Sequence, residues 1–366
     1  MLTYAFDLLY AIYEEEGNDP AEIPEKILTH NLYGIEIDER AGELAAFALT
    51  MKARAKQRRF FNKGVKPNIC VLENVHFDEG EIKEVISDQW SVVSGASRED
   101  ILHDLNLFEE ADNFGSLVRP RLTSEQCTKL RGHLTGHWSL ATSHSLFDSM
   151  THQRVLQALR QADYLSPKYH VVISNPPYMG GKGMNGRLGA WVKDNYPKSK
   201  SDLFAMFIER NLDLAQKHGT VAMITMQIWM FLSSYEVLRA LLLRQNTILS
   251  MAHLGARAFD SISGEVVSTT AFVLENANRQ DYKGGYLRLV DGNSESEKDK
   301  AIREAVRRPD CSWLYCATAG DFNKIPGSPI AYWVSHKIAG TFDEPGLADV
   351  IITEGQNKTA NNDKYV

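Results

Sequence analysis

The stretch of sequence that most constrains the fold is VVISNPPYMGGKG, which begins at Val171. A run of β-branched residues ends in Asn175, and Pro176 and Pro177 follow at once. Two consecutive prolines cannot donate to a sheet ladder or continue a helix, so a strand must end here. The pattern therefore predicts a buried strand that places an asparagine, a stiff backbone carbonyl and the ring of Tyr178 at its carboxyl end.

Short apolar runs alternate with helical patterns along much of the chain, which is typical of an α/β fold with a parallel sheet. Strands are predicted at residues 32–37, 68–72, 170–174, 220–226, 248–253 and 269–274, and helices at 2–16, 41–59, 201–217 and 233–244. Ligands bind outside the carboxyl ends of the strands in such a sheet. The end of the 170–174 strand is therefore the first candidate site.

Composition limits the class of protein. The chain has 366 residues, of which 43% are hydrophobic, and a formal net charge of −7, which argues against a surface that binds nucleic acid everywhere. No apolar run is long enough to span a bilayer and the first helix has no basic leader, so a cytoplasmic protein is predicted. The cysteines and one group of histidines match no usual ligand spacing, so no metal site is predicted; they are Cys70, Cys127, Cys311, Cys316, His133, His137 and His144.

Residues 78–165 interrupt the alternation, because they show helical patches and scattered charge but no convincing strand. We therefore predict four parts. Residues 1–77 begin the main domain, 78–165 are a helical insertion, 166–283 complete the main domain, and 284–366 are a charge-dense and then irregular connector.

The groups at the end of the 170–174 strand suit a particular ligand. The carboxamide oxygen of Asn175 and the carbonyl of Pro176 are both acceptors, so together they suit an NH₂ group with two hydrogens. Tyr178 offers a flat face for a ring. Accepting both hydrogens draws the amine towards tetrahedral geometry and exposes its lone pair, which makes it a nucleophile without a strong base. The alternative is a proline-rich turn with no chemistry.

A second candidate site follows the first predicted strand, in LYGIEIDERAG. An acidic side chain at the end of a strand is how a nucleotide-binding fold holds ribose hydroxyls, and Glu36 is our choice for this role. Asp38 is assigned to capping the next helix. The alternative is that both side chains only cap that helix.

Two basic stretches are candidates for a phosphate backbone. Residues 51–68 carry seven Lys or Arg and no acid, and residues 180–200 carry five Lys or Arg against one Asp. The alternative for each is a solvated helix or loop surface.

The asparagine, prolines and tyrosine at 175–178 resemble the catalytic motif of S-adenosylmethionine-dependent N6-adenine DNA methyltransferases. The longer string NPPYMGGKGMNGRLGAWVKDNYPKSKSDLFAMFIERNLDLAQ resembles more specifically the PglX family of BREX phage defence, and the resemblance covers nearly the whole chain. It implies a Rossmann-like methyltransferase sheet, the cofactor S-adenosyl-L-methionine and double-stranded DNA as partner. It also implies that residues 284–366 lead into a target-recognition region.

The resemblance assigns roles to individual residues. Asn175 and the carbonyl of Pro176 would hold the adenine N6, with Pro177 completing the motif, and Tyr178 would stack on a base flipped out of the duplex. Phe259 would contact its opposite face. On the donor side, the resemblance implies Glu36 for the ribose, Ile37 for packing on the adenine, and Glu73 for the amine of that adenine.

One feature of the family is missing. The glycine-rich loop that wraps the donor should precede the helix at 2–16, and the only glycine cluster, at 180–183, follows the catalytic motif instead. We therefore expect a fragment or one piece of a split gene, with little donor binding alone and with the remainder of the enzyme or other defence proteins as partners. Rival readings are a methyltransferase acting on protein glutamine or RNA, and a non-catalytic remnant that binds DNA.

Overall fold

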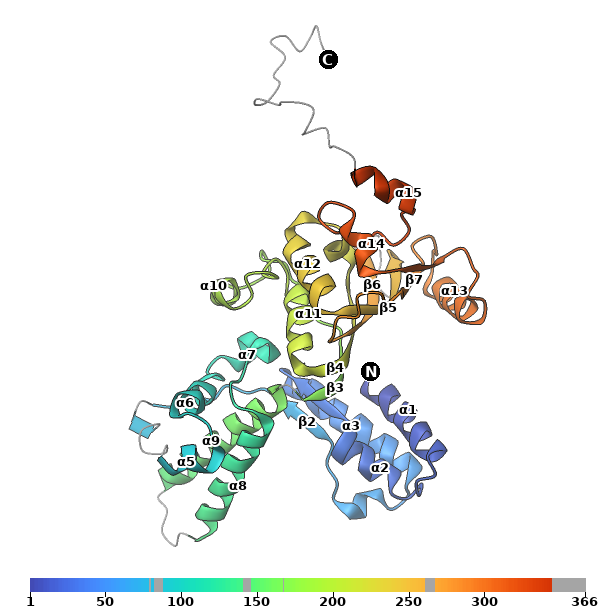
Figure 1. Cartoon of the computed structure of the whole chain (residues 1–366). Helices are drawn as coiled ribbons and strands as arrows, with labels where there is room; N and C mark the ends of the chain where they lie inside the picture. The colour runs from blue at the N-terminus through green and yellow to red at the C-terminus, as the bar shows by residue number, and fades with distance from the viewer. Residues whose placement is uncertain (79, 82–87, 141–145, 167, 261–266, 344–366) are drawn as a thin grey trace, which may run out of the picture. The chain divides into compact units, whose positions relative to one another are not determined.

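The computed structural model describes residues 1–343 except 79, 82–87, 141–145, 167 and 261–266 (Figure 1). The chain forms two compact units, which are described separately. The first comprises Met1–Ile173, Asn185–Trp191 and Arg210–Gln216, and the second comprises Ser174–Met184, Val192–Glu209 and Lys217–Val366.

The first unit opens with helices around a small apolar core. In α1 (Leu2–Glu15) the side chains of Phe6 and Tyr10 are buried, as expected from the one-sided spacing of its apolar residues. The core continues through α2 (Ile23–Lys26), the π-helical turn η1 (Ile27–Asn31), α3 (Glu39–Lys56) and the 3₁₀ turn η2 (Phe60–Lys63). Burial of these apolar faces is the main stabilising term, about 25 cal/mol for each Å² removed from water.

Two parallel strands lie against these helices. In β1 (Tyr33–Glu36) and β2 (Asn68–Val71) the register places Glu36 opposite Val71, and the Leu72 amide donates to the Glu36 carbonyl at 2.8 Å. Helix α3 approaches β2 closely at Gly42, where an added Cβ would lie 2.6 Å from a methyl of Val71. The carboxyl ends of both strands therefore lie at the same edge of this two-stranded sheet.

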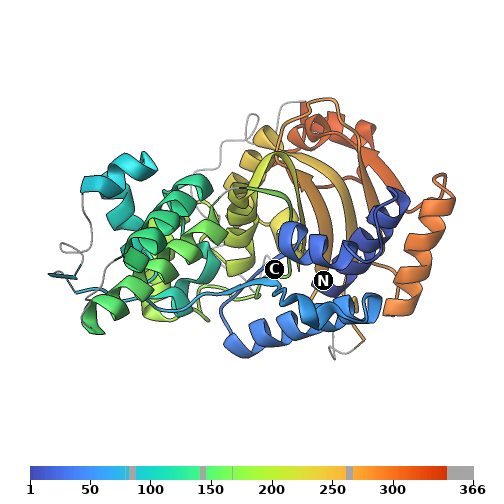
Figure 2. The same cartoon turned by 90° about the horizontal axis from the view of Figure 1, so that it is seen from below.

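Residues 88–165 of the same unit are helical in the described part of the chain. The elements are α5 (Asp88–Ser94), α6 (Arg98–Asn106), α7 (Ala111–Phe114), the 3₁₀ turn η3 (Gly115–Leu117), α8 (Ser124–Leu140) and α9 (Leu146–Leu165). Figures 1 and 2 show α8 and α9 side by side.

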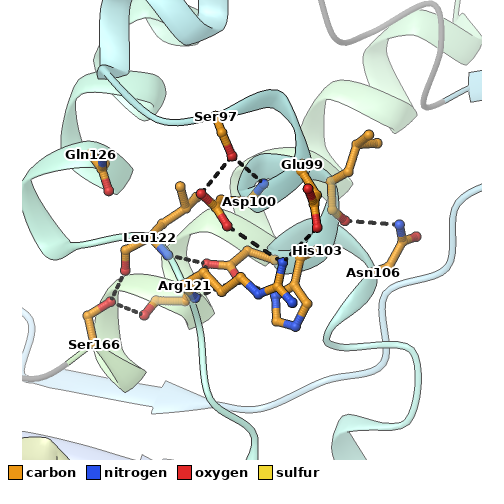
Figure 3. Close-up of polar contacts among 12 residues, drawn as sticks. Ser97, Glu99, Asp100, His103, Asn106, Arg121, Leu122, Gln126 and Ser166 are labelled. Carbon is orange, nitrogen blue, oxygen red and sulfur yellow. Dashed lines mark hydrogen bonds and ion pairs between the residues drawn. The ribbon is translucent and has the colours of Figure 1, made fainter.

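A buried carboxylate fixes the segment between η3 and α8. Asp104, 1% exposed, accepts hydrogen bonds from the backbone amides of Arg121 and Leu122, both at 2.8 Å. Figure 3 shows Ser166 beside Leu122, whose carbonyl accepts from the Ser166 hydroxyl at 2.8 Å. The turn is thus tied to α6 on one side and to the end of α9 on the other.

The second unit contains a mixed sheet, whose yellow and orange strands lie side by side in Figure 2. Its strands run in the order β4-β6-β5-β7-β8, with bounds β4 (Ala215–Met226), β5 (Thr247–Gly255), β6 (Thr269–Glu275), β7 (Gly284–Arg288) and β8 (Leu314–Ala317). Because β6 is antiparallel to both β4 and β5, the carboxyl ends of β4 and β5 point to the same edge. The catalytic-motif candidate follows β3 (Tyr169–Ser174), in which Val171 and Ile173 are about half exposed.

The remaining helical elements follow or connect these strands. They are α10 (Gly186–Asn195), α11 (Leu203–Leu214), the 3₁₀ turns η4 (Gln227–Met230) and η5 (Ser233–Tyr235), α12 (Glu236–Gln245), α13 (Glu295–Arg307), α14 (Ala319–Asn323), α15 (His336–Ala339) and η6 (Gly340–Asp343).

The six predicted strands and the four predicted helices are confirmed to within a few residues, except that β4 begins at Ala215, where a helix was predicted to continue to residue 217. Three expectations are wrong. The strand before the motif, β3, is not buried, since Val171 and Ile173 are 56% and 50% exposed. The larger sheet is mixed rather than parallel, because β6 runs against both its neighbours. Residues 284–343, the described part of the last predicted region, are not irregular, since β7, α13 and β8 form there. The four-part division of the chain stays a prediction.

Candidate functional site

The asparagine and the tyrosine that follow β3 differ in their exposure to solvent. Asn175 is exposed, and no described residue forms a hydrogen bond with its carboxamide. Pro176 is buried, whereas its neighbours Asn175 and Pro177 are exposed. The ring of each proline fixes its own φ and so stiffens the backbone here. Tyr178 is half-buried, and burial raises the pKa of its hydroxyl. The carboxamide of Asn175 is therefore available to a ligand.

A buried carboxylate holds the loop immediately after Tyr178. Asp202 is 6% exposed, and its Oδ1 accepts the backbone amide of Met179 at 3.0 Å and that of Phe204 at 3.2 Å. The Leu203 amide in turn donates to the Met179 carbonyl at 3.1 Å. Burial raises the pKa of Asp202, while the backbone amides that donate to it oppose that rise. Asp202 thus ties the residue after the motif to the start of α11.

Rings fix the orientation of Tyr178. Phe204 meets it edge-on, with ring centroids 6.2 Å apart and planes at 88°, and Phe204 packs on Tyr235 at 5.7 Å. Phe204 is fully buried. Such edge-to-face contacts contribute roughly 0.5–1.5 kcal/mol beyond burial. The Tyr178 ring is therefore held before any ligand arrives. Sequence reasoning missed the role of Asp202, although SDLF before an apolar helix is a capping signal.

The first donor-side candidate, Glu36, lies at the end of β1 in the first unit. Its Oε1 accepts the amides of Ile37 at 2.8 Å and of Asp38 at 3.2 Å, and no described residue donates to its Oε2. Asp38 caps α3 by accepting the Ala41 amide at 3.0 Å, which confirms the predicted cap. Backbone amides therefore hold Oε1 of Glu36, and Oε2 has no described partner, which is compatible with a hydroxyl ligand.

Ile37 is half exposed, at 51%, and lies against the 3₁₀ turn η3. A Cβ built on Gly115 would lie 3.1 Å from the Ile37 Cγ2, and Gly115 has a positive φ of 54°. The absence of a side chain at Gly115 therefore lets this turn approach Ile37 closely.

The second candidate for binding the methyl donor, Glu73, lies just beyond β2. It is exposed, but two side chains of helix α9 form hydrogen bonds with it. The Glu73 amide donates to Gln161 Oε1 at 2.5 Å, and Gln161 Nε2 donates back to the Glu73 carbonyl at 3.1 Å. Gln157 Nε2 donates to the Glu73 carboxylate. These residues line part of a cavity of about 760 Å³ between β2, α8 and α9. Sequence reasoning gave no indication of the two glutamines.

Phe259 follows β5 in the second unit and is partly exposed, and it makes no ring contact with a described residue. Part of the first basic stretch is engaged within its own unit. Lys52 pairs with Asp7, Lys63 pairs with Glu25 at 2.7 Å, and Lys56 lies over the Tyr10 ring. These three cations are less available to phosphate than the sequence suggested.

A polar and aromatic cluster that sequence reasoning missed lies where β4 and β5 end. His253 Nε2 donates to Gln227 Oε1 at 2.7 Å, and its Nδ1 accepts from the Tyr332 hydroxyl at 3.0 Å. The ring of Trp333 stacks on His253 with centroids 6.0 Å apart. Burial lowers the pKa of His253 to about 4, so the imidazole is neutral at pH 7.

Among the described residues, no group of three or more His, Cys, Asp or Glu side chains could hold a metal ion, and no helix is long and apolar enough to cross a membrane. His144 lies outside the described residues, and the side chain of His137 is not described either.

Residues 30–259 match the family of Eco57I restriction-modification methylases, and this match covers more than half of the chain. The chain belongs to this family. It is 39% identical over 359 residues to an adenine-specific methyltransferase BrxX of Escherichia coli O9:H4 (strain HS), and 38% identical over 354 residues to an adenine-specific methyltransferase PglX of Lacticaseibacillus casei (strain Zhang). These alignments cover 93% and 92% of this chain but 29% and 28% of the relatives.

The comparisons confirm the resemblance to PglX-type adenine-specific methyltransferases and the α/β methyltransferase fold. Among solved structures, the chain is similar to a nuclease-deletion mutant of the Type ISP restriction-modification enzyme LlaGI in complex with a DNA substrate mimic, with a TM-score of 0.50 and 12% identity over 90% of this chain and 23% of that one. It is equally similar, with a TM-score of 0.50, to the DrdV–DNA complex, at 14% identity over 92% of this chain and 27% of that one. At these identities the likeness concerns the fold alone.

Proposed function

We propose that this Eco57I-family chain carries the methyl-transfer part of a site-specific DNA adenine-N6 methyltransferase that uses S-adenosyl-L-methionine, in phage defence or restriction-modification. The observation that carries the proposal is the exposure of Asn175. Its carboxamide has no described partner and lies at the end of a strand, three residues before the aromatic ring of Tyr178. A turn without chemistry has no need for this combination.

The residues at the ends of β1 and β2 support binding of the donor. Backbone amides hold one carboxylate oxygen of Glu36, and no described residue forms a hydrogen bond with the other, which suits a ribose hydroxyl. Ile37 is an exposed apolar side chain at the same edge, which suits the face of a purine. Glu73 is a carboxylate acceptor that suits the amine of that purine. S-adenosyl-L-methionine, when bound, supplies an electrophilic methyl group.

The chain's own residues then prepare the nucleophile. The Asn175 Oδ1 and the Pro176 carbonyl accept the two N6 hydrogens of an extruded adenine, and Tyr178 stacks on the base. When N6 forms its bond to the methyl carbon, the carbon–sulfur bond breaks, and N6 then loses a proton to water. Extrusion costs a few kcal/mol. A stacked base returns about 1–3 kcal/mol and each hydrogen bond about 1 kcal/mol, so the site roughly offsets that cost.

The test is mass spectrometry of N6-methyladenine in DNA incubated with the protein and donor. Asn175→Ala should lower the rate at least about 100-fold, because N6 loses the acceptor that positions it. Tyr178→Phe should keep most of the activity, whereas Tyr178→Ala should lose it. Normal methylation by Asn175→Ala would refute the proposal. Methylation of RNA or of protein glutamine in place of DNA would favour the rival substrates.

A further inference from the structure

The segment that follows β2 is held by the helical part of the first unit at three consecutive residues. Glu73 exchanges two backbone hydrogen bonds with the Gln161 side chain. The Asn74 side chain accepts the Asp112 amide at 3.0 Å, and the Val75 amide donates to the Phe108 carbonyl at 2.9 Å. The path of the chain beyond β2 is therefore set by Phe108, Asp112 and Gln161 as well as by the sheet.

Side chains of helix α9 form hydrogen bonds with the backbone of β2 and of Glu73, the second residue after it, as a neighbouring strand would. Arg160 donates to the Ile69 carbonyl at 3.1 Å, and the primary amide of Gln161, 1% exposed, satisfies both the amide and the carbonyl of Glu73. A primary amide is a donor and an acceptor at once, so it can replace a peptide group in a ladder. The backbone amide and carbonyl of Glu73 are thus both bonded to Gln161, and the carboxylate of this exposed residue remains for other partners.

Gln157 completes the arrangement because it acts on the carboxylate rather than on the backbone. Its Nε2 donates to one oxygen, Oε2, of Glu73. One Glu73 oxygen is thereby occupied and the other keeps its lone pairs for a ligand. On the β1 side, η3 of the same helical region contacts Ile37 through Gly115. Both donor-side candidates for the purine thus contact this region.

We propose that residues 108–117 and 157–161 form one wall of the methyl-donor site, and that Gln157 and Gln161 position the Glu73 carboxylate so that it selects donors whose purine carries an exocyclic amine. This inference rests on the proposed function. Gln157 and Gln161 are positioning residues, since they act through Glu73. A purely structural role for α9 would affect folding but would not change the preference between two purines.

The test is calorimetric titration of the full chain with S-adenosylhomocysteine and with its inosine counterpart, which has an acceptor oxygen in place of the amine. The wild-type chain should bind the adenosine form about tenfold more tightly, the effect of one well-placed hydrogen bond. Gln157→Leu should reduce this preference to about two- to threefold. Gln153→Leu, on the exposed side of α9 one turn earlier, is the matched control and should keep the wild-type preference.

A second variant tests whether misfolding, rather than loss of the Gln157 amide, explains a reduced preference. Gln157→Asn shortens the side chain by one methylene, so the amide no longer reaches Glu73, and it should reproduce the loss of preference with an unchanged urea midpoint. If both Gln157 variants keep the tenfold preference while Glu73→Ala abolishes it, the inference is wrong and the role of Glu73 stands.

The remaining outcomes concern the proposed function. If Glu73→Ala keeps the wild-type preference, the assignment of Glu73 to the donor purine is wrong, and the inference falls with it. If the wild-type chain binds neither compound, the donor-binding part of the proposed function is refuted for this chain, together with the inference.

Discussion

Replacing Asp202 should loosen the loop that follows the candidate catalytic motif. In the native protein one carboxylate oxygen accepts the amides of Met179 and Phe204, at 3.0 and 3.2 Å, in a site with 6% exposure. Asp202→Ala leaves both amides without this acceptor. Asp202→Asn keeps an oxygen at the same position and removes the charge. Comparison of the two variants therefore separates the hydrogen bonds from the charge.

The magnitude follows from the two amides. Leaving a buried donor unsatisfied costs about 1–3 kcal/mol, and relief from burying a charge offsets part of the sum, so Asp202→Ala should destabilise the loop by roughly 1.5–3 kcal/mol. Asp202→Asn should stay within about 1 kcal/mol of the wild type, because both hydrogen bonds persist.

The pH dependence has a definite sign. Burial raises the pKa of Asp202 above its ordinary value of 3.8, so the folded state binds the proton more tightly than the unfolded state. This contribution to stability is complete below pH 3.8 and is lost as the pH rises through the higher folded pKa. Stability of Asp202→Asn relative to the wild type should therefore increase as the pH rises from about 4 towards neutrality.

The assay is hydrogen exchange at the Met179 and Phe204 amides, which reports local opening. Exchange should accelerate about ten- to a hundredfold in Asp202→Ala and change little in Asp202→Asn. Unchanged protection of both amides in Asp202→Ala would show that the carboxylate does not hold this loop. If methyl transfer also depends on the loop, Asp202→Ala should lower it while Asp202→Asn retains it.

Two further predictions concern stability. The neutral state of His253 stabilises the fold at pH 8, and because burial lowers its pKa from 6.5 to about 4, about 2 kcal/mol of that contribution should be lost on going to pH 5. Urea unfolding at several pH values should show this loss in the wild type and a flatter profile in His253→Gln; equal profiles would contradict it. Asp104→Ala should destabilise the first unit by about 2–4 kcal/mol, since the amides of Arg121 and Leu122 lose their acceptor. Asp112→Ala, at an exposed carboxylate of the same unit with no described partner, is its control, and equal urea midpoints for the two variants would refute the argument.

Local patterns predicted what depends on nearby residues. The strand before Asn175 and the cap at Asp38 could be read from a few consecutive letters, because proline and short polar side chains act within one turn. The contact between Gln157 and Glu73 could not, because 84 residues separate them and a glutamine inside a helix gives no signal of its partner. The sequence does not predict helix α13, although Ser294 accepts the Glu297 amide at 3.2 Å in a recognisable cap, because a high charge density is also typical of a connector.

The strand that carries the motif also has a consequence for the behaviour of the chain in solution. Residues 169–174, YHVVIS, combine high β-propensity with no acidic or basic side chain apart from a histidine, and Val171 and Ile173 meet water. Such a segment tends to pair with copies of itself in other molecules. Pro176 and Pro177 stop that pairing from extending further along the chain, so the prolines that shape the motif also limit aggregation.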